Sequence, residues 1–477
     1  MDFDNSYAMI IDGKPDTGSA SFEVLNPATE KVIARVPNAT REDLDRAVAA
    51  AHKAFPAWAA TPIAERKAKL QELANAVFAN ADALAAVLTR EQGKSLSDAK
   101  MEIMATGFWI QSYTSLDLPV KVNEDSEERY SETRHVPIGV VGAISPWNFP
   151  LLLSNFKLPP ALLAGNTVVL KPSPYTPLAV LKFGELAAQI LPPGVLNIVT
   201  GGDDLGPWLT THPGIDKVSF TGSTQTGRRV MASAAASLKR VTLELGGNDA
   251  AIILPDVNVE KLAPQMFWAA FGNNGQICIA TKRIYVHKDI YEPFKAAFVA
   301  YAKTVKVGDG TAEGTQLGPI NNKAQYARVL ELIKDAKDKG YKIALGGEQQ
   351  AGPGYFVPPT VIDNPPENSR IVQEEQFGPV VPLIQYDNYD DVIARVNGTD
   401  FGLGASIWAT DVAKASELAQ RIQSGTVWIN EVYHLSPLAA FGGMKQSGVG
   451  VEGGLQGLLE YTQTQTLTRN KKPAYAA

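Results

Sequence analysis

The sequence has a single cysteine among 477 residues, which excludes any disulfide bond within the chain. Its five histidines are scattered, with no second histidine or cysteine at zinc-ligand spacing, so we expect no metal site. No run of about 20 uncharged apolar residues occurs, so we expect no membrane span. The first residues also lack the basic and apolar regions of a signal peptide. These absences predict a cytoplasmic protein, because thiols stay reduced there.

The sequence also has no excess of basic over acidic residues. The chain has 44 Lys and Arg against 50 Asp and Glu, a formal net charge of −6. An acidic protein has no electrostatic reason to bind nucleic acid or an anionic membrane. The 45% hydrophobic fraction is ordinary for a globular protein, and the length is too great for one core. We therefore expect two or three domains.

The hydrophobic pattern changes along the chain. The first 20 or so residues predict a short arm or hairpin, and Ala-rich segments over 41–116 predict helices, with Thr40 as an N-cap. From 137 onward, short β-branched runs alternate with helical segments. This alternation predicts an α/β fold with a doubly wound parallel sheet, which binds ligands at the carboxyl ends of its strands. The β-like runs are 138–144, 166–171, 194–200, 216–221, 240–245 and 250–254.

A second strand–helix series follows, beginning at KRIYVHK and ending at GTVWIN, and it predicts a second α/β domain. Two segments fit neither series. Residues 119–136 and 459–477 alternate β-prone and polar side chains. Strands without a partner in their own domain are candidates for an intersubunit sheet.

Cys278 lies in FGNNGQICIATKR, directly after a polar, turn-prone stretch. A lone cysteine in an arbitrary protein is most often a small buried apolar residue. Here the turn-prone context predicts that the thiol follows a loop. Cysteines at loop–helix junctions can have a lowered pKa and react as thiolates, so Cys278 is a candidate nucleophile.

Two further polar side chains stand out. Glu244 ends an apolar strand in VTLELGGN, where it is either a structural ion pair or backbone cap, or a general base whose pKa is raised by partial burial. Asn148 lies in SPWNFP between Pro146 and Pro150. It is either a common turn asparagine or an amide donor to a developing oxyanion.

Two segments suit a nucleotide. FTGSTQTG (220–227) predicts a strand, a glycine-rich turn and a helix start, whose N–H groups can bind a pyrophosphate, although it is not a GxGxxG motif. KPSP (171–174) ends another strand. Lys171 and Ser173 can hydrogen-bond a ribose there, or Lys171 is a surface charge.

Seven segments together carry a family resemblance. They are PWNFP, FTGSTQTG, LELGGN, GQIC, EEQFGPV (374–380), GTVWIN (425–430) and FGGMKQSGVG (441–450). In this order, with 34 residues from Glu244 to Cys278, they resemble the aldehyde dehydrogenase superfamily over essentially the whole chain. The resemblance implies a homodimer or homotetramer with three parts. These are a dinucleotide-binding domain (1–118 and 137–247), a catalytic domain (248–458) and an oligomerisation arm (119–136 and 459–477).

The resemblance also implies roles for individual residues. Cys278 would be the nucleophile, Glu244 the base and Asn148 the oxyanion donor, while Lys157 and Glu452 match a pair linked in the family to proton relay. In an NADP or NAD site, Glu375 would hold the nicotinamide ribose. The whole site would comprise Ile144, Ser145, Pro146, Trp147, Lys171, Ser173, Gly206, Phe220, Gly222, Ser223, Leu245, Gly246, Glu375 and Phe377. The aldehyde site would comprise Phe149, Leu153, Phe156, Ile277, Ile279 and His434.

The implied chemistry is coherent. The thiolate adds to an aldehyde, and Asn148 with the Cys278 backbone N–H stabilises the oxyanion. Hydride then passes to the nicotinamide, and Glu244 activates the water that hydrolyses the thioester. The presence of this glutamate favours release of the free acid over transfer to CoA.

The sequence departs from the family pattern in ways that bear on specificity. Pro174 stands where many members carry a glutamate that binds the adenine ribose, so we expect NADP to be used, with or alongside NAD. Phe156 stands where relatives that oxidise succinate semialdehyde carry an arginine, so we expect uncharged aliphatic or aromatic aldehydes. The alternative is a semialdehyde dehydrogenase that admits a charged group near His434. Ala440 replaces a usual proline and Val451 a frequent arginine, and neither has a functional interpretation.

Two other classes of protein fit less well. A non-catalytic dinucleotide-binding protein on the same fold would be expected to lose its nucleophile, yet all three candidate catalytic residues are present. A cysteine hydrolase would need a histidine base paired with Cys278, and no histidine lies in a suggestive motif.

Overall fold

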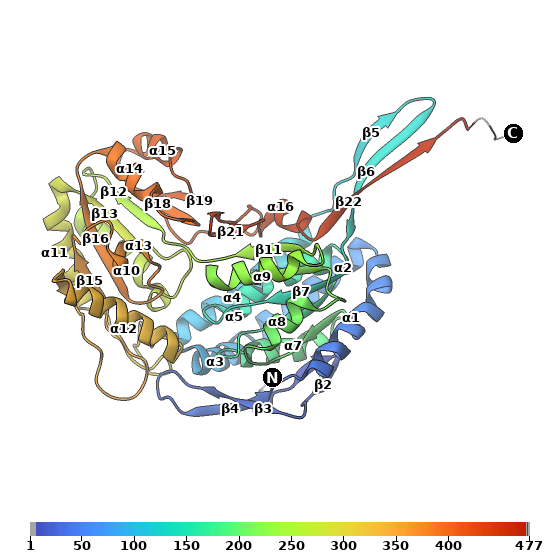
Figure 1. Cartoon of the computed structure of the whole chain (residues 1–477), viewed down its shortest axis with the longest axis horizontal. Coiled ribbons are helices and arrows are strands. Elements are labelled where there is room, and N and C mark those ends of the chain that lie inside the picture. The colour runs from blue at the N-terminus through green and yellow to red at the C-terminus, as the bar shows by residue number, and fades with distance from the viewer. Residues whose placement is uncertain (1–5, 474, 476–477) are drawn as a thin grey trace.

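Five of the six predicted β-branched runs form the centre of an eight-stranded sheet (Figure 1), and the sixth, 250–254, becomes a strand of the second sheet. The structure is a computed structural model that describes residues 6–473 and 475. Residues 1–5, 474, 476 and 477, which belong to the first and last predicted segments, lie outside the described part. The strand order is β2 (Lys14–Asp16), β1 (Met9–Ile11), β9 (Leu196–Ile198), β8 (Thr167–Lys171), β7 (Val140–Ile144), β10 (Lys217–Thr221), β11 (Arg240–Glu244) and β21 (Gly448–Val449). The five strands from β9 to β11 are parallel, as predicted.

Helices pack around this sheet. Thr40 begins the first of them with a capping box, because its side chain accepts from the Asp43 N–H and its own N–H donates to the Asp43 carboxylate. The helices are α1 (Arg41–Ala60), α2 (Ile63–Ala79), α3 (Ala81–Gln92), α4 (Leu96–Ser112), α5 (Pro150–Asn155), α6 (Leu158–Leu163), α7 (Leu178–Ala188), α8 (Leu205–Thr211) and α9 (Thr224–Ala235). A hairpin of β3 (Ser21–Leu25) and β4 (Val32–Pro37), which the sequence analysis missed, precedes them.

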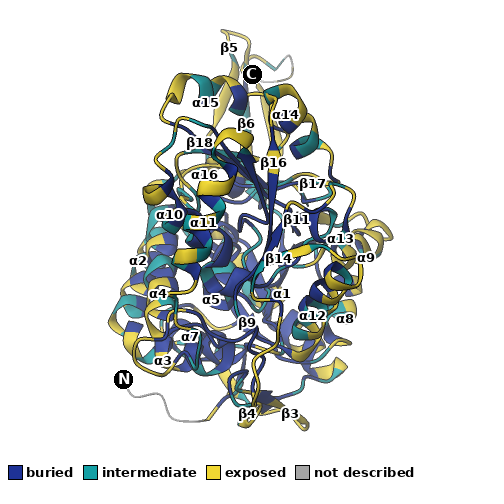
Figure 2. Ribbon diagram, turned by 90° about the vertical axis from the view of Figure 1, so that its left-hand side faces the viewer, coloured by how far each residue is buried: buried dark blue, intermediate teal, exposed yellow. Residues whose placement is uncertain are grey.

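The second sheet has seven strands, and all neighbours except β14 and β15 are parallel. Its order is β14 (Lys342–Leu345), β15 (Thr360–Asp363), β16 (Val380–Tyr386), β13 (Arg283–His287), β12 (Ala250–Ile253), β18 (Gly404–Trp408) and β19 (Thr426–Ile429). Its helices are α10 (Val259–Phe271), α11 (Tyr291–Ala302), α12 (Lys323–Asp338), α13 (Arg370–Gln373), α14 (Tyr389–Asn397) and α15 (Val412–Ala419). In Figure 2 the central strands are buried and the outer faces of the helices are exposed. The predicted α/β fold is therefore confirmed.

The two orphan β-like segments pair with each other. β5 (Lys121–Asp125), β6 (Arg129–Pro137) and β22 (Thr462–Asn470) form a three-stranded antiparallel sheet, which projects from the body of the molecule (Figure 1). The last part of the second series also returns to the first sheet, because β21 pairs with β11. After β21 the chain forms α16 (Gly454–Leu459) and then enters β22.

One of the helical segments expected between the β-branched runs is broken in the structure. Residues 151–164, LLLSNFKLPPALLA, lie mostly in α5 and α6 instead of in one helix, because Pro159 and Pro160 fit the start of a helix and not its interior. The break leaves Lys157 at the N-cap of α6 with its side chain fully buried. Within the described residues, no helix is long and apolar enough to cross a membrane.

Candidate active site

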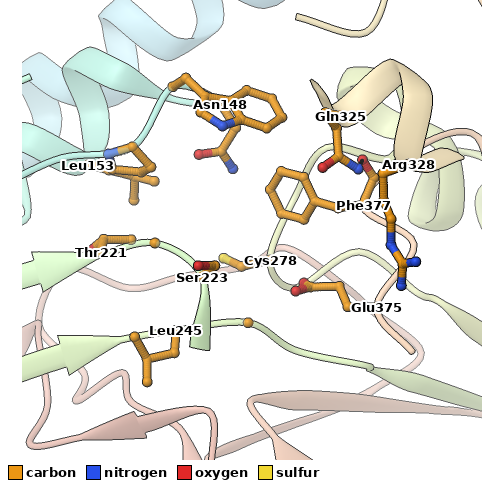
Figure 3. A pocket seen from close by; sticks show the side chains of 14 residues that line it. Asn148, Leu153, Thr221, Ser223, Leu245, Cys278, Gln325, Arg328, Glu375 and Phe377 are labelled. Atoms are coloured by element: carbon orange, nitrogen blue, oxygen red, sulfur yellow. Dashed lines mark hydrogen bonds between the residues drawn. The ribbon is translucent and has the colours of Figure 1, made fainter. Parts of the chain in front are cut away.

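A cavity of about 220 Å³ is lined by residues from both α/β parts of the chain (Figure 3). Several lining residues follow the carboxyl ends of parallel strands of the first sheet, where ligands of such sheets bind. The second sheet's part of the chain contributes Cys278 from the opposite side. The lining residues are Pro146, Trp147, Asn148, Leu153, Thr221, Gly222, Ser223, Leu245, Gly246, Cys278, Gln325, Arg328, Glu375 and Phe377.

A tight turn carries Cys278 into the cavity. After α10, three consecutive residues, Asn273, Asn274 and Gly275, have φ of 48°, 58° and 74°. Asparagine and glycine tolerate this left-handed region best, which explains the NNG sequence. At Gly275 a Cβ atom would lie 2.3 Å from the Gly378 carbonyl oxygen, so the turn also requires glycine for space. Cys278 follows in a loop, as the sequence predicts.

The expectation of a lowered thiol pKa is wrong. Burial raises the pKa of the half-buried Cys278 to about 12. The Lys282 ammonium lowers this pKa, whereas the carboxylates of Asp249, Glu375 and Glu244 raise it. The Cys278 thiol is therefore mostly protonated near neutral pH. To act as a nucleophile, Cys278 would need a nearby group that accepts the thiol proton.

Asn148 contacts the loop that carries Cys278 directly. Its side-chain Nδ2 donates to the Gln276 carbonyl oxygen at 2.9 Å. An amide nitrogen has two N–H bonds, so the second remains to meet an oxyanion. The side chain is thus a link between the two loops and not only a turn residue.

A buried ion pair holds the Asn148 backbone from behind. Lys94 Nζ donates to the Asn148 carbonyl oxygen at 2.9 Å and to Glu102 Oε2 at 2.6 Å, and neither charged side chain is exposed. Glu102 Oε1 in turn accepts from the Leu151 N–H at 3.0 Å. Removing one partner of a buried pair leaves an uncompensated charge, at a cost of about 3–5 kcal/mol. The Asn148 loop is therefore held rigidly.

Glu244 has a buried carboxylate without a hydrogen-bond partner among the described residues. Neither the ion-pair nor the cap interpretation is supported, and burial raises the pKa of Glu244 well above its usual range, as expected for a base. The Glu452 carboxylate raises it further, and the Lys157 ammonium lowers it. Lys157 Nζ donates to Glu452 Oε1 at 2.6 Å and to Thr221 Oγ1 at 2.7 Å. The structure thus brings Lys157, Glu452 and Glu244 together.

The other end of the cavity suits a dinucleotide. Ser223 caps α9, accepting from the Thr226 N–H, so Gly222 and Ser223 present a helix N-terminus to the cavity. At Gly246 a Cβ atom would lie 2.4 Å from Glu375 Oε2, so glycine is needed for that carboxylate to approach the backbone. Glu375 Oε1 accepts from the Gly247 N–H at 3.1 Å.

Aromatic packing shapes the same end of the cavity. Trp147 and Phe377 meet edge to face, with ring centroids 5.3 Å apart. Phe377 has a φ of 48°, which is rare for a bulky residue and points to a functional constraint.

Lys171 is 6% exposed, so the surface-charge alternative is wrong. Its Nζ donates only a long hydrogen bond, 3.3 Å, to the Pro172 carbonyl oxygen, and burial lowers the pKa of Lys171 to about 8. An amine so placed has donors to spare for ribose hydroxyls. Lys171 does not itself border the cavity, and neither do five other predicted cofactor residues. These five are Ile144, Ser145, Ser173, Gly206 and Phe220.

Of the six predicted aldehyde-site residues, only Leu153 borders the cavity. Phe156 is 2% exposed because it stacks on Trp109 with ring centroids 3.7 Å apart. Ile279 packs into the same hydrophobic core, and Ile277 packs against it. Phe149 lies under Lys94 Nζ, 3.7 Å from its ring centroid. The His434 side chain is 69% exposed.

Sequence reasoning missed three lining residues. Thr221 ends strand β10, so its position at the carboxyl edge of the sheet was a usable signal. Gln325 and Arg328 lie on α12, and no local pattern marks them. Gln325 Nε2 donates to the carbonyl oxygens of Gln376, 2.9 Å, and Phe377, 3.0 Å, and so supports the loop that carries Glu375.

Comparison with known proteins identifies this arrangement. The sequence profile of the aldehyde dehydrogenase family matches residues 14–467. The chain belongs to the aldehyde dehydrogenase family. The general reaction of the family is the NAD(P)-dependent oxidation of an aldehyde to the carboxylic acid. The family prediction made from the seven segments is therefore confirmed.

Individual relatives cover nearly the whole chain. Aldehyde dehydrogenase LUC3 of a Fusarium species is 40% identical over 470 residues, covering 98% of this chain and 99% of that protein. The NAD⁺ complex of aldehyde dehydrogenase from Bacillus cereus is 39% identical, with a TM-score of 0.95 and coverage of 98% and 96%. An NADP-dependent enzyme of E. coli is 34% identical, with a TM-score of 0.95 and coverage of 97% and 98%.

Proposed function

We propose that Cys278 is the nucleophile of this aldehyde dehydrogenase and that Glu244 is its general base. The observation that carries the proposal is one cavity lined by a thiol, the Asn148 amide and Glu375, beside a buried carboxylate without a partner. An unpaired buried carboxylate costs stability and is retained where a proton must be taken up. Asn148 Nδ2 and the Cys278 N–H would hold the oxyanion.

The cofactor residues fit a nicotinamide dinucleotide. The N-terminus of α9 would bind the pyrophosphate, Glu375 would bind one ribose, and Lys171 with Ser173 would bind the other. When bound, the dinucleotide supplies the hydride acceptor of the oxidation. The chain supplies the remaining chemistry: Glu244 accepts protons, first from the thiol and then from water, and the Lys157–Glu452 pair beside it is suited to pass protons on.

The test of this function is reduction of the cofactor, followed by absorbance at 340 nm, with a panel of aldehydes and with NAD and NADP in parallel. We expect NADP to be used appreciably, with or alongside NAD. Pro174 can neither bind the ribose hydroxyl nor repel a phosphate, and the Lys171 amine lies nearby in sequence. A kcat/KM with NADP more than about a thousandfold below that with NAD, roughly 4 kcal/mol, would contradict this.

We expect uncharged aldehydes to be preferred over semialdehydes. Of the predicted aldehyde-site residues, Leu153 borders the cavity, and its side chain is apolar. Phe156, which stands where a cation would be needed to bind the carboxylate of a semialdehyde, stacks in the core. Arg328 lines the cavity, but its guanidinium is already bound to Glu374. A carboxylate that enters without a free cationic partner loses hydration worth several kcal/mol. Competition between hexanal or benzaldehyde and succinate semialdehyde measures this preference. A higher kcat/KM for succinate semialdehyde would favour the alternative, in which the exposed His434 admits the charged group.

We also propose that the sheet of β5, β6 and β22 is an oligomerisation arm in a homodimer or homotetramer. Its two outer strands have unpaired edges, and such edges readily pair with another chain. Sedimentation equilibrium measures the number of chains in the assembly.

The rest of the chain divides into two proposed domains. Residues 1–118 and 137–247 would bind the cofactor, and residues 248–458 would carry the catalytic residues. A cytoplasmic location is proposed because the reaction requires the free thiol of Cys278 to stay reduced.

A further inference from the structure

Lys282 lies directly beneath the nucleophile loop, and the mechanism above does not use it. Its side chain is 3% exposed. Its Nζ donates to the carbonyl oxygens of Cys278, at 2.6 Å, and of Ile277, at 2.9 Å, and lies 3.5 Å from Glu375 Oε1. One buried ammonium thus contacts the peptide groups on both sides of the nucleophile and a carboxylate that lines the cavity.

The contact with Ile277 bears on the oxyanion site. The Ile277 carbonyl and the Cys278 N–H belong to one peptide unit, and in a planar trans peptide the two groups point in opposite directions. Fixing the carbonyl therefore fixes the direction of the N–H. The Ile277 oxygen also accepts from the Ala280 N–H at 3.0 Å, so two donors hold it. A carbonyl polarised in this way makes its own N–H a stronger donor.

The ammonium also balances the charges that face the thiol. Asp249, Glu375 and Glu244 act on Cys278 as carboxylates, and Tyr433 faces it as a phenol. Lys282 is the cation that opposes them within the described residues. Without it, three carboxylates would disfavour the thiolate unopposed.

We propose that Lys282 is a positioning residue that orients the Cys278 N–H toward the oxyanion and supplies the positive charge under the nucleophile. The proposal rests on the proposed role of Cys278 as the nucleophile. Lys282 also connects the Cys278 loop with the cofactor side of the cavity, because its ammonium lies beside the Glu375 carboxylate.

Alkylation of the thiol tests the charge without any turnover. Because the chain has one cysteine, iodoacetamide labelling of the full-length protein reports Cys278 alone. We expect Lys282→Met to label about tenfold more slowly at pH 8, which corresponds to a rise of one pKa unit. Lys282→Arg, which keeps the charge, should stay within about threefold of the wild type. Lys295→Met is the matched control, because Lys295 is a largely buried ammonium bound to Asp363 at 2.9 Å, away from the cavity.

Steady-state kinetics test the positioning. We expect Lys282→Met to lower kcat by about a hundredfold with KM for the aldehyde changed less than threefold, as for loss of oxyanion stabilisation. A folded Lys282→Met protein with wild-type labelling between pH 7 and 9 and wild-type kcat would overturn the proposal. So would an arginine variant that labels as slowly as the methionine variant. If Lys282→Met does not fold, Lys282→Gln gives the same comparison. Failure of the proposed function would show differently, as turnover that survives alkylation of Cys278.

Discussion

Replacing Cys278 with alanine is expected to lower kcat/KM for aldehyde oxidation by at least about 10⁴-fold, or about 5.5 kcal/mol. The side chain that forms the covalent intermediate is removed, and no other thiol exists in the chain to replace it. Dinucleotide binding should stay within about twofold, because the proposed cofactor contacts come from other residues. Absorbance at 340 nm measures the oxidation, and a fluorescence titration measures the binding.

A serine at the same position is the matched control for packing. Cys278→Ser keeps the size and a polar hydrogen but offers a much weaker nucleophile, so it should resemble the alanine variant in rate and the wild type in stability. Full steady-state activity in either variant would rule out the mechanism proposed for this cavity.

Replacing Glu244 with glutamine is expected to uncouple the two halves of the reaction. The first turnover should still give a burst of reduced cofactor, but steady turnover should fall by about 10²–10³-fold, because no carboxylate remains to activate water. The burst should also be slower than in the wild type, because in the proposed mechanism Glu244 accepts the thiol proton before it activates water. Rapid mixing, followed at 340 nm, separates the burst from the steady state.

The pH dependence follows from the raised pKa of Glu244. A base acts only when deprotonated, so wild-type turnover should fall as the pH drops through that raised pKa, and the glutamine variant should lose this dependence. Glu460→Gln is the control, because Glu460 contacts Thr242 on the same strand yet keeps its side chain 31% exposed. A Glu244→Gln enzyme with normal turnover would remove Glu244 from the mechanism and leave the role of Cys278 intact.

Local patterns were sufficient for most of the fold, although they missed the β3–β4 hairpin and the break between α5 and α6. The apolar run ending at Glu244 predicted both a buried strand and a carboxylate at its carboxyl end. The NNG sequence predicted a loop before Cys278. These signals are short-range, since φ preferences and hydrophobic periodicity act within a few residues.

The environment of the thiol depends on contacts that no local pattern contains. The pKa of Cys278 is set by burial and by Lys282, Asp249, Glu375 and Glu244, which meet only in the folded chain. The lowered pKa expected from the loop was therefore wrong. The same limit applies to Gln325, which reaches the cavity from a helix of the second half, and to the Lys94–Glu102 pair behind the Asn148 loop.

The pairing of β21 with β11 has a consequence for biosynthesis. Glu244 lies opposite Gly448, about 200 residues later in the chain. At translation rates of about 5–20 residues per second, β11 remains an open edge for roughly 10–40 s after it is made. Glu452, which helps to raise the pKa of Glu244, emerges from the ribosome later still. In the proposed mechanism, a nascent chain on the ribosome therefore carries the nucleophilic thiol long before the surroundings of its general base are complete.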